Sequence, residues 1–240
     1  MTANRFLTDT STARRSLLRA AVAGTAGAGL ALGATPASAA PRGSERPDTP
    51  AGALRELAAG NRRWRAHRER HPHESPAVRR QLVQGQHPFA VVLGCIDSRV
   101  PPEHVFDQGL GDLMTVRSAG EVLDEAVLGS VAYGVLELGI PLVMVLGHQS
   151  CGAVKAAVQV DASGERLPAH IQYLADQIRP AIDRTQQGEA RIDATVSAQA
   201  RLVRDRLAAE PDLAAEIAGG RLAVVAARYE LHDQSVRTLV

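Results

Sequence analysis

Two short stretches of this chain carry side chains that could bind a metal ion. The only two cysteines, Cys95 and Cys151, lie just beyond apolar runs that stop at a glycine, and His148 lies three residues before the second cysteine. Thiolate and imidazole are ligands that zinc prefers in proteins. Three such groups leave a fourth tetrahedral position for water, a carboxylate or a substrate, which is typical of catalytic zinc. The pattern therefore predicts a catalytic zinc centre.

A disulfide is the main alternative for the two cysteines, because two cysteines most often pair when a protein is exported, and the N-terminal residues described below predict export. Inert buried thiols are a further alternative. His148, three residues before Cys151, and Asp97, two residues after Cys95, favour the metal over both. For Asp97 and Arg99, spacing alone leaves two interpretations open, a catalytic pair or a plain ion pair at the end of a strand.

The sequence around these residues predicts strands that alternate with helices. Residues 89–94, 113–117 and 142–146 are short apolar runs typical of buried strands, and residues 124–139 have helical periodicity. This alternation predicts an α/β fold with a central, mostly parallel sheet flanked by helices. Both ligand stretches then lie at the carboxyl ends of parallel strands, where open α/β sheets place their sites.

The remainder of the chain is expected to be mainly helical. Periodicity predicts helices over 53–69 and 151–160 and within 161–220, then a β-type run at 222–227. A chain of 240 residues can bury one substantial core. We place that domain at residues 53–240.

The first 39 residues resemble a twin-arginine export signal. Arg14 and Arg15 precede a mildly apolar run rich in alanine and glycine, and small residues allow cleavage after Ala39. A disordered tail or a membrane anchor is the alternative, but the run is too short and too polar to span a bilayer comfortably. We therefore expect an exported protein, secreted or on the periplasmic side of the cell envelope, without stable membrane insertion after signal removal. Residues 40–52, which contain three prolines, are predicted to be a linker.

The charge distribution argues against a nucleic-acid partner. The chain has 27 basic and 26 acidic side chains, and four arginines and one aspartate of the first 39 residues leave 23 basic and 25 acidic ones in the rest. A body so close to neutral lacks the basic patch that nucleic-acid binding requires.

The two metal-binding stretches resemble the signatures of the β-class carbonic anhydrases. Residues 95–103 begin with the Cys-x-Asp-Ser-Arg pattern of that family, and residues 147–152 contain its His-x-x-Cys pattern. Three further segments agree with the family: 57–64, 111–113 and 229–231. The resemblance covers about residues 53–235.

The resemblance implies that Cys95, His148 and Cys151 bind Zn²⁺ and that Asp97 and Arg99 form the catalytic pair. The implied reaction is the reversible hydration of carbon dioxide to bicarbonate and a proton by a zinc-bound hydroxide. Arg99 would hold Asp97 away from the metal, and without that hold Asp97 could become a fourth zinc ligand. A homodimer or a higher oligomer is also implied, because the family's carbon dioxide pocket forms across a dimer interface.

Two features depart from the family pattern. Residues 117–121 are Arg-Ser-Ala-Gly-Glu where many members have Arg-Asn-Ala-Gly-Asn, and Gln108 lies one position away from a glutamine that some members use to bind substrate. Other functions remain open: hydrolysis of carbonyl sulfide or carbon disulfide on the same scaffold, or zinc binding without catalysis. Asp97 and Arg99 argue against the last, because binding alone needs no such pair. A disulfide-bonded interaction module is the remaining alternative.

Overall fold

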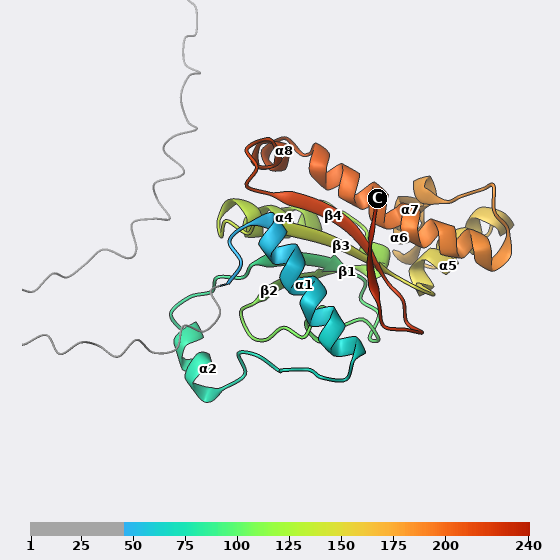
Figure 1. Ribbon diagram of the computed structural model, residues 1–240. Coiled ribbons are helices and arrows are strands. Elements are labelled where there is room, and N and C mark those ends of the chain that lie inside the picture. The colour runs from blue at the N-terminus through green and yellow to red at the C-terminus, as the bar shows by residue number, and fades with distance from the viewer. Residues whose placement is uncertain (1–45) are drawn as a thin grey trace, which may run out of the picture. The chain divides into compact units, whose positions relative to one another are not determined.

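A five-stranded sheet forms the centre of the part of the chain that the computed structural model describes, residues 46–240 (Figure 1). The predicted export signal, residues 1–39, and residues 40–45 of the predicted linker lie outside the described residues and stay predictions. In chain order the strands are β1 (Ala90–Gly94), β2 (Leu113–Arg117), β3 (Leu142–His148), β4 (Ala223–Tyr229) and β5 (Val236–Leu239).

The sheet is mostly parallel, as the sequence predicts. Its strand order is β2-β1-β3-β4-β5, in which the first four strands are parallel and β5 is antiparallel to β4. The chain moves outward from β1 to β2 and then returns to place β3 on the other side of β1. At such a reversal the connections leave in opposite directions and open a crevice at the carboxyl ends of the two strands. Gly94 of β1 pairs with Leu146 of β3, so the residues after β1 emerge beside His148.

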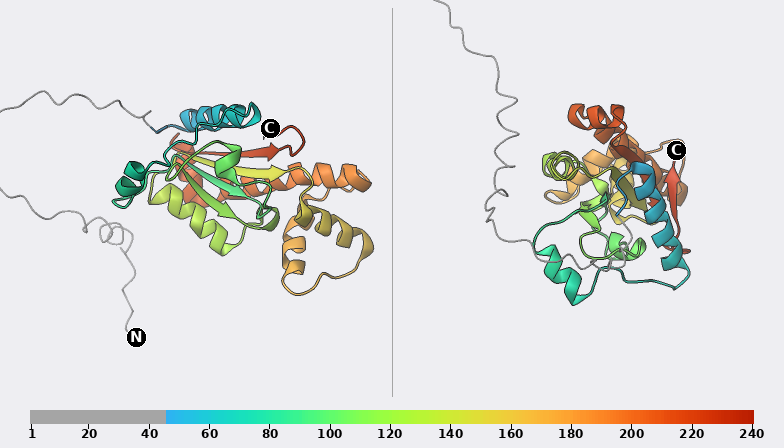
Figure 2. Two further views of the ribbon diagram at one scale, coloured as in Figure 1. Left: turned by 90° about the horizontal axis from the view of Figure 1, so that it is seen from below. Right: turned by 60° about the vertical axis from the view of Figure 1, so that its left-hand side comes forward.

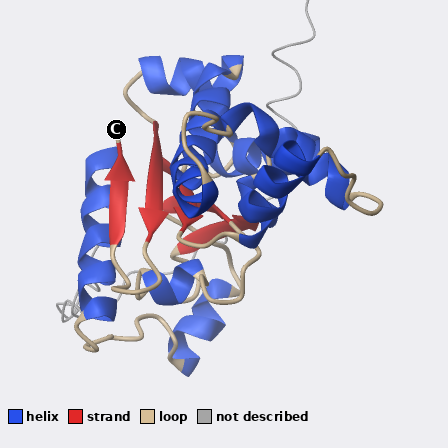
Figure 3. Ribbon diagram, turned by 90° about the vertical axis from the view of Figure 1, so that its right-hand side faces the viewer, coloured by secondary structure: helices blue, strands red, loops and turns tan. Residues whose placement is uncertain are grey.

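Helices cover both faces of the sheet (Figures 2 and 3). Helix α1 (Pro50–Arg65) and the short α3 (Pro102–Val105) lie on one face, against side chains such as Val92 and Met144. Helices α4 (Glu125–Leu136), α7 (Gly188–Ala209) and α8 (Pro211–Ala218) pack on the other face against Val91 and Val143. Because successive strand residues face opposite cores, the strands are apolar throughout rather than alternating.

A third apolar cluster lies beyond the carboxyl ends of the strands. It is built from α5 (Gly152–Ser163), α6 (Ile171–Ile178) and part of α7, and it includes both cysteines. Two short 3-10 helices, η2 (Ala119–Glu121) and η3 (Arg179–Ala181), complete this end of the molecule. Helix α2 (Pro76–Leu82) belongs to the segment between α1 and β1.

Several boundaries differ from the sequence prediction. Helix α1 begins at Pro50, inside the predicted linker, because the Thr49 hydroxyl accepts a hydrogen bond from the Gly52 N–H at 3.2 Å and a proline suits the first helical position. The late β-type run continues to Tyr229, and the chain then returns as β5, which the sequence prediction missed. Four residues at an exposed sheet edge are too few to show a period.

None of the helices within residues 46–240 combines the length and the apolar character needed to cross a membrane.

Candidate metal centre

The structure brings Cys95, His148 and Cys151 together at the carboxyl ends of β1 and β3. Their potential ligand atoms lie within 4.8 Å of one another, and all three side chains are buried. Cys95 directly follows β1, His148 is the last residue of β3, and Cys151 is the N-cap residue of α5. The ends of two neighbouring parallel strands therefore bring the predicted ligands together.

The His148 ring is oriented to offer Nε2 to a cation. Its Nδ1 lies 2.9 Å from the carbonyl oxygen of Gln149, and a carbonyl only accepts, so Nδ1 carries the proton. Nε2 is buried and makes no well-formed hydrogen bond with the residues in 46–240. A buried ring nitrogen without a partner is costly unless a metal ion takes its lone pair. This donor set fits zinc.

The two cysteines are free thiols whose Sγ atoms lie 3.9 Å apart, well beyond the roughly 2.05 Å of a disulfide. The hydrogen bond from Cys151 lowers the pKa of the Cys95 thiol, against the effect of burial, and the same bond raises the pKa of Cys151. The pair therefore shares one proton, with the negative charge on Cys95. A divalent cation would displace the remaining proton, as metal binding to thiols does.

Arg99 holds Asp97 in a fork of hydrogen bonds. The Nε atom and one terminal nitrogen of Arg99 donate to the two carboxylate oxygens at 2.9 and 2.7 Å, and the Arg99 backbone N–H donates to Oδ1 at 2.9 Å. The Arg99 side chain thereby lowers the pKa of Asp97 to about 2. Asp97 Oδ2 lies 3.9 Å from His148 Nε2. An ionised carboxylate thus stands beside the metal-ligand group, held by the arginine.

Arg117 supports the same loop and was missed by the sequence analysis. It ends β2, opposite Gly94 of β1, and its side chain donates to the carbonyl oxygens of Cys95 at 2.8 Å and Asp97 at 2.7 Å. These bonds hold the loop that carries one candidate zinc ligand and the predicted catalytic carboxylate. A charged residue at the end of a mostly apolar strand was the available signal.

Glu121 is the most unusual acidic residue near the site. Its side chain is buried, and Oε1 has no hydrogen-bond partner among the described residues. Burial raises the pKa of Glu121 well above its usual range, and the negative charge of Cys95 adds to the effect. The surroundings of Glu121 therefore favour its neutral, protonated form. The sequence marked residues 118–121 as a departure from the family pattern, but it gave no sign of this burial.

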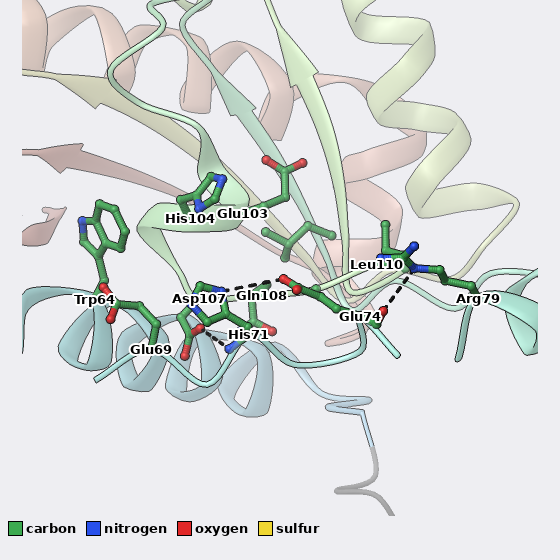
Figure 4. Close-up of a pocket in the computed structure, with 13 residues that line it drawn as sticks. Trp64, Glu69, His71, Glu74, Arg79, Glu103, His104, Asp107, Gln108 and Leu110 are labelled. Carbon is green, nitrogen blue, oxygen red and sulfur yellow. Dashed lines mark hydrogen bonds and ion pairs between the residues drawn. The ribbon is translucent and has the colours of Figure 1, made fainter. Parts of the chain in front are cut away.

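Gln108 belongs to a different part of the structure. Its amide nitrogen donates to the Phe106 carbonyl at 2.9 Å and to Glu56 at 3.3 Å. Gln108 lines a cavity of about 400 Å³ beside α1 and α3, with Trp64, Glu103 and His104 also on its walls (Figure 4). None of the three candidate metal ligands lines that cavity. The structure therefore does not bring Gln108 into the metal centre.

Comparison with known proteins agrees with this geometry. A sequence family described as carbonic anhydrase matches residues 90–236. Carbonic anhydrase 2 of Mycobacterium tuberculosis is 41% identical over 186 residues, which cover 77% of this chain and 90% of the relative. The carbonic anhydrase of Mycolicibacterium smegmatis is 40% identical over 192 residues, covering 78% of this chain and 92% of the relative.

Solved structures show the same fold. The β-carbonic anhydrase CcaA superposes with a TM-score of 0.63 at 24% identity, over 77% of this chain and 94% of that chain. One of two tetrameric β-carbonic anhydrases from Sordaria macrospora also gives 0.63, at 19% identity, over 78% of this chain and 96% of that chain. This chain therefore belongs to the carbonic anhydrase family, and its fold is that of the β-class enzymes.

Proposed function

We propose that Asp97 and Arg99 are the catalytic pair of this carbonic anhydrase, beside zinc held by Cys95, His148 and Cys151. The enzyme catalyses the reversible hydration of carbon dioxide to bicarbonate and a proton. When bound, zinc lowers the pKa of a water molecule toward neutrality and so supplies the nucleophile. The observation that carries the proposal is the forked Asp97–Arg99 pair, 3.9 Å from the His148 nitrogen that would face the metal.

Asp97 is suited to orient the attacking water. With a pKa of about 2 it is ionised throughout the neutral range, and a carboxylate oxygen can accept a further hydrogen bond besides the one from Arg99. If Asp97 accepts a hydrogen bond from the water, it directs the water's lone pair toward the carbon of carbon dioxide. Arg99 keeps its charge at all relevant pH values, so it fixes the plane of the carboxylate without itself titrating.

The same fork bears on the prediction that Asp97 is a fourth zinc ligand. Both carboxylate oxygens accept hydrogen bonds from Arg99, and Asp97 lies outside the group formed by the two thiols and His148. Asp97 would have to leave both bonds to join that group. The conformation seen here therefore suits the orienting role of Asp97. Ligation of zinc by Asp97 stays a prediction for a second conformation, in which Asp97 has left Arg99.

The Asp97→Asn variant tests the proposal, because it keeps the size of the side chain and removes its charge. We expect carbon dioxide hydration, followed by stopped flow from pH 6.5 to 9, to fall about 10²-fold, with zinc still near one per chain. The Asp183→Asn variant, at a half-buried position outside the metal centre, is the matched control and should keep full activity. An Asp97→Asn protein as active as the control would refute the proposed role. Loss of zinc from it would instead identify Asp97 as a ligand.

We also propose that the enzyme is a homodimer or a higher oligomer. Ile96, next to the catalytic pair, is 61% exposed, although the substrate is apolar and a dry wall would favour it. A second copy of the chain could cover this side of the site, and the Sordaria neighbours are described as tetrameric. Light scattering should give at least twice the mass of one chain, and a monomer mass would contradict the proposal.

Export by the twin-arginine route is our proposal for the location of the enzyme. It rests on Arg14, Arg15 and the small residues before Ala40 in the sequence. In a host with this route, we expect anhydrase activity outside the cytoplasm and a mature N-terminus at Ala40. Replacement of both arginines by lysine should retain the activity inside the cell. Export unaffected by that change would argue against the route.

A further inference from the structure

The turn between β2 and α4 makes a direct contact with a metal-ligand candidate. The Gly120 N–H donates a hydrogen bond to Cys95 Sγ over 3.4 Å. Gly120 has φ 67° and ψ 31°, and Glu121 follows with φ 52°, so two successive residues adopt the left-handed conformation. A non-glycine residue in this region is uncommon, and such strain persists only where surrounding structure enforces it.

The space around Gly120 explains why a glycine occupies this position. A Cβ atom there would come within 2.8 Å of Ile178 Cδ1 and 3.2 Å of Ala153 Cβ. Helices α5 and α6 therefore press directly on the turn. They define how close the turn can come to Cys95, but apolar contacts do not fix the direction in which its N–H groups point.

Gln199 of α7 supplies that direction. Its Nε2 donates to the Gly120 carbonyl oxygen at 3.1 Å, across 79 positions of sequence. The Gln199 side chain is only 1% exposed, and its Oε1 has no hydrogen-bond partner among the described residues. Burying a glutamine with an unpaired amide oxygen costs free energy. We expect this only where the hydrogen bond from the amide nitrogen has a structural or functional role.

We propose that Gln199 is a positioning residue of the zinc centre, which holds the left-handed turn at Gly120 so that the Gly120 N–H remains on the Cys95 sulfur. The proposal rests on the assignment of Cys95 as a zinc ligand. Without the Gln199 amide, the Gly120 carbonyl is left buried and unpaired, and the strained turn relaxes away from Cys95.

The N–H to sulfur hydrogen bond has an electronic consequence. It withdraws charge from the sulfur, so Cys95 would donate less to a bound metal ion, which would then be a stronger Lewis acid. Loss of the bond makes Cys95 a stronger donor. The pH at which hydration activity rises should then be higher, and the sulfur-to-metal charge-transfer band of a Co²⁺-substituted enzyme should move to longer wavelength.

The test compares Gln199→Met with Gln172→Met in the full chain. Methionine keeps the approximate length and removes the amide. Gln172 is a matched control because it is 8% exposed on α6 and makes two hydrogen bonds of 2.9 Å, with the Leu167 N–H and with Asp176, none of them with the metal centre. Gln199→Asn, which keeps the amide on a shorter side chain, is a second variant in case the methionine variant does not fold.

For both Gln199 variants we expect zinc to pass to a competing chelator about 10- to 100-fold faster than from the wild type, together with the shifts in the pH profile and the cobalt band. Gln172→Met should leave all three unchanged, even if its melting temperature falls. Gln199 variants that match Gln172→Met in zinc release and in the cobalt spectrum would overturn the proposal. Absence of zinc from the wild type, or its retention by Cys95→Ser, would instead refute the ligand assignment.

Discussion

This fold lowers the pKa of one buried carboxyl group, Asp107, and raises that of another, Glu121. Asp107, in the loop between α3 and β2, accepts hydrogen bonds from the Arg63 side chain at 2.5 Å and from the Arg70 and His71 N–H groups at 3.0 and 3.1 Å. Burial alone would raise the pKa of Asp107, but these donors outweigh it and hold the pKa below its usual range. Glu121 lies beside the metal centre, and burial raises its pKa without such compensation.

The difference separates a residue that stabilises the fold, Asp107, from one that lies beside the candidate metal centre, Glu121. Asp107 ties the end of α1 and the following loop to the wall of the cavity in Figure 4, and its hydrogen-bond donors together favour the charged form over the opposing effect of burial. Around Glu121 the negative charge belongs to the Cys95 thiolate, so a second charge nearby is disfavoured. The surroundings therefore favour a negative charge on the Cys95 sulfur and disfavour a second one on Glu121.

The largest effect on stability is expected at Asp107. Asp107→Ala leaves the Arg63 guanidinium and two backbone N–H groups without their acceptor, so the free energy of unfolding should fall by about 3 to 5 kcal/mol. Asp107→Asn keeps one acceptor and should lose less. Urea titration measures both, and zinc per folded chain should remain near one. A loss below about 1 kcal/mol for the alanine variant would show that Asp107 is no more than a surface ion pair.

A smaller loss of stability, with a loss of zinc, is expected for Gly120→Ala. The added methyl group meets Ile178 and Ala153, and alanine resists φ 67°, which together should cost about 2 kcal/mol. Gly164→Ala is the matched control, because Gly164 has φ 74° and nothing within 4 Å of the added Cβ. It should show only the backbone cost, about 1 kcal/mol, and retain zinc. Equal zinc retention in both variants would contradict a role of the turn at Cys95.

The smallest expected effect is the change in stability per pH unit that Glu121 causes. Because its pKa is raised in the folded state above the ordinary 4.5, folding takes up a proton, and wild-type stability is lost as the pH rises above 4.5 toward the folded pKa. Glu121→Gln removes this dependence. The stability of the variant relative to the wild type should therefore grow by up to about 1.4 kcal/mol per pH unit. Thermal unfolding from pH 4.5 to 8 measures it, and a constant difference would mean that Glu121 is ionised in the fold.

The sequence prediction succeeded where rare residue types carry the chemistry. Cysteine occurs twice in the chain, and both copies proved to be in the metal group with His148. The parallel sheet was predictable because strands buried on both faces are apolar throughout. The prediction was wrong at the start of α1 and missed β5, where capping and edge pairing decide. The prediction also kept a disulfide open, which the separation of the sulfur atoms contradicts.

The supporting residues could not be found in the same way. Glu121 and Gln199 are ordinary polar residues in the sequence, and nothing local distinguishes them from residues exposed to solvent. Their roles come from burial and from partners far along the chain, such as the 79 positions between Gln199 and Gly120. The exposure of a side chain is a property of the packed structure, so these roles appear only once the helices are in place.

By itself the sequence determined the candidate donor atoms for zinc, the Asp97–Arg99 pair and the class of fold, because these depend on residue type and on spacing along strands and helices. Tertiary structure decided which acids are charged, which nitrogen of His148 is free and which residues hold the Cys95 loop. The physical reason is that hydrogen bonding and the loss of water act through space, so they follow from packing between segments that the sequence order separates.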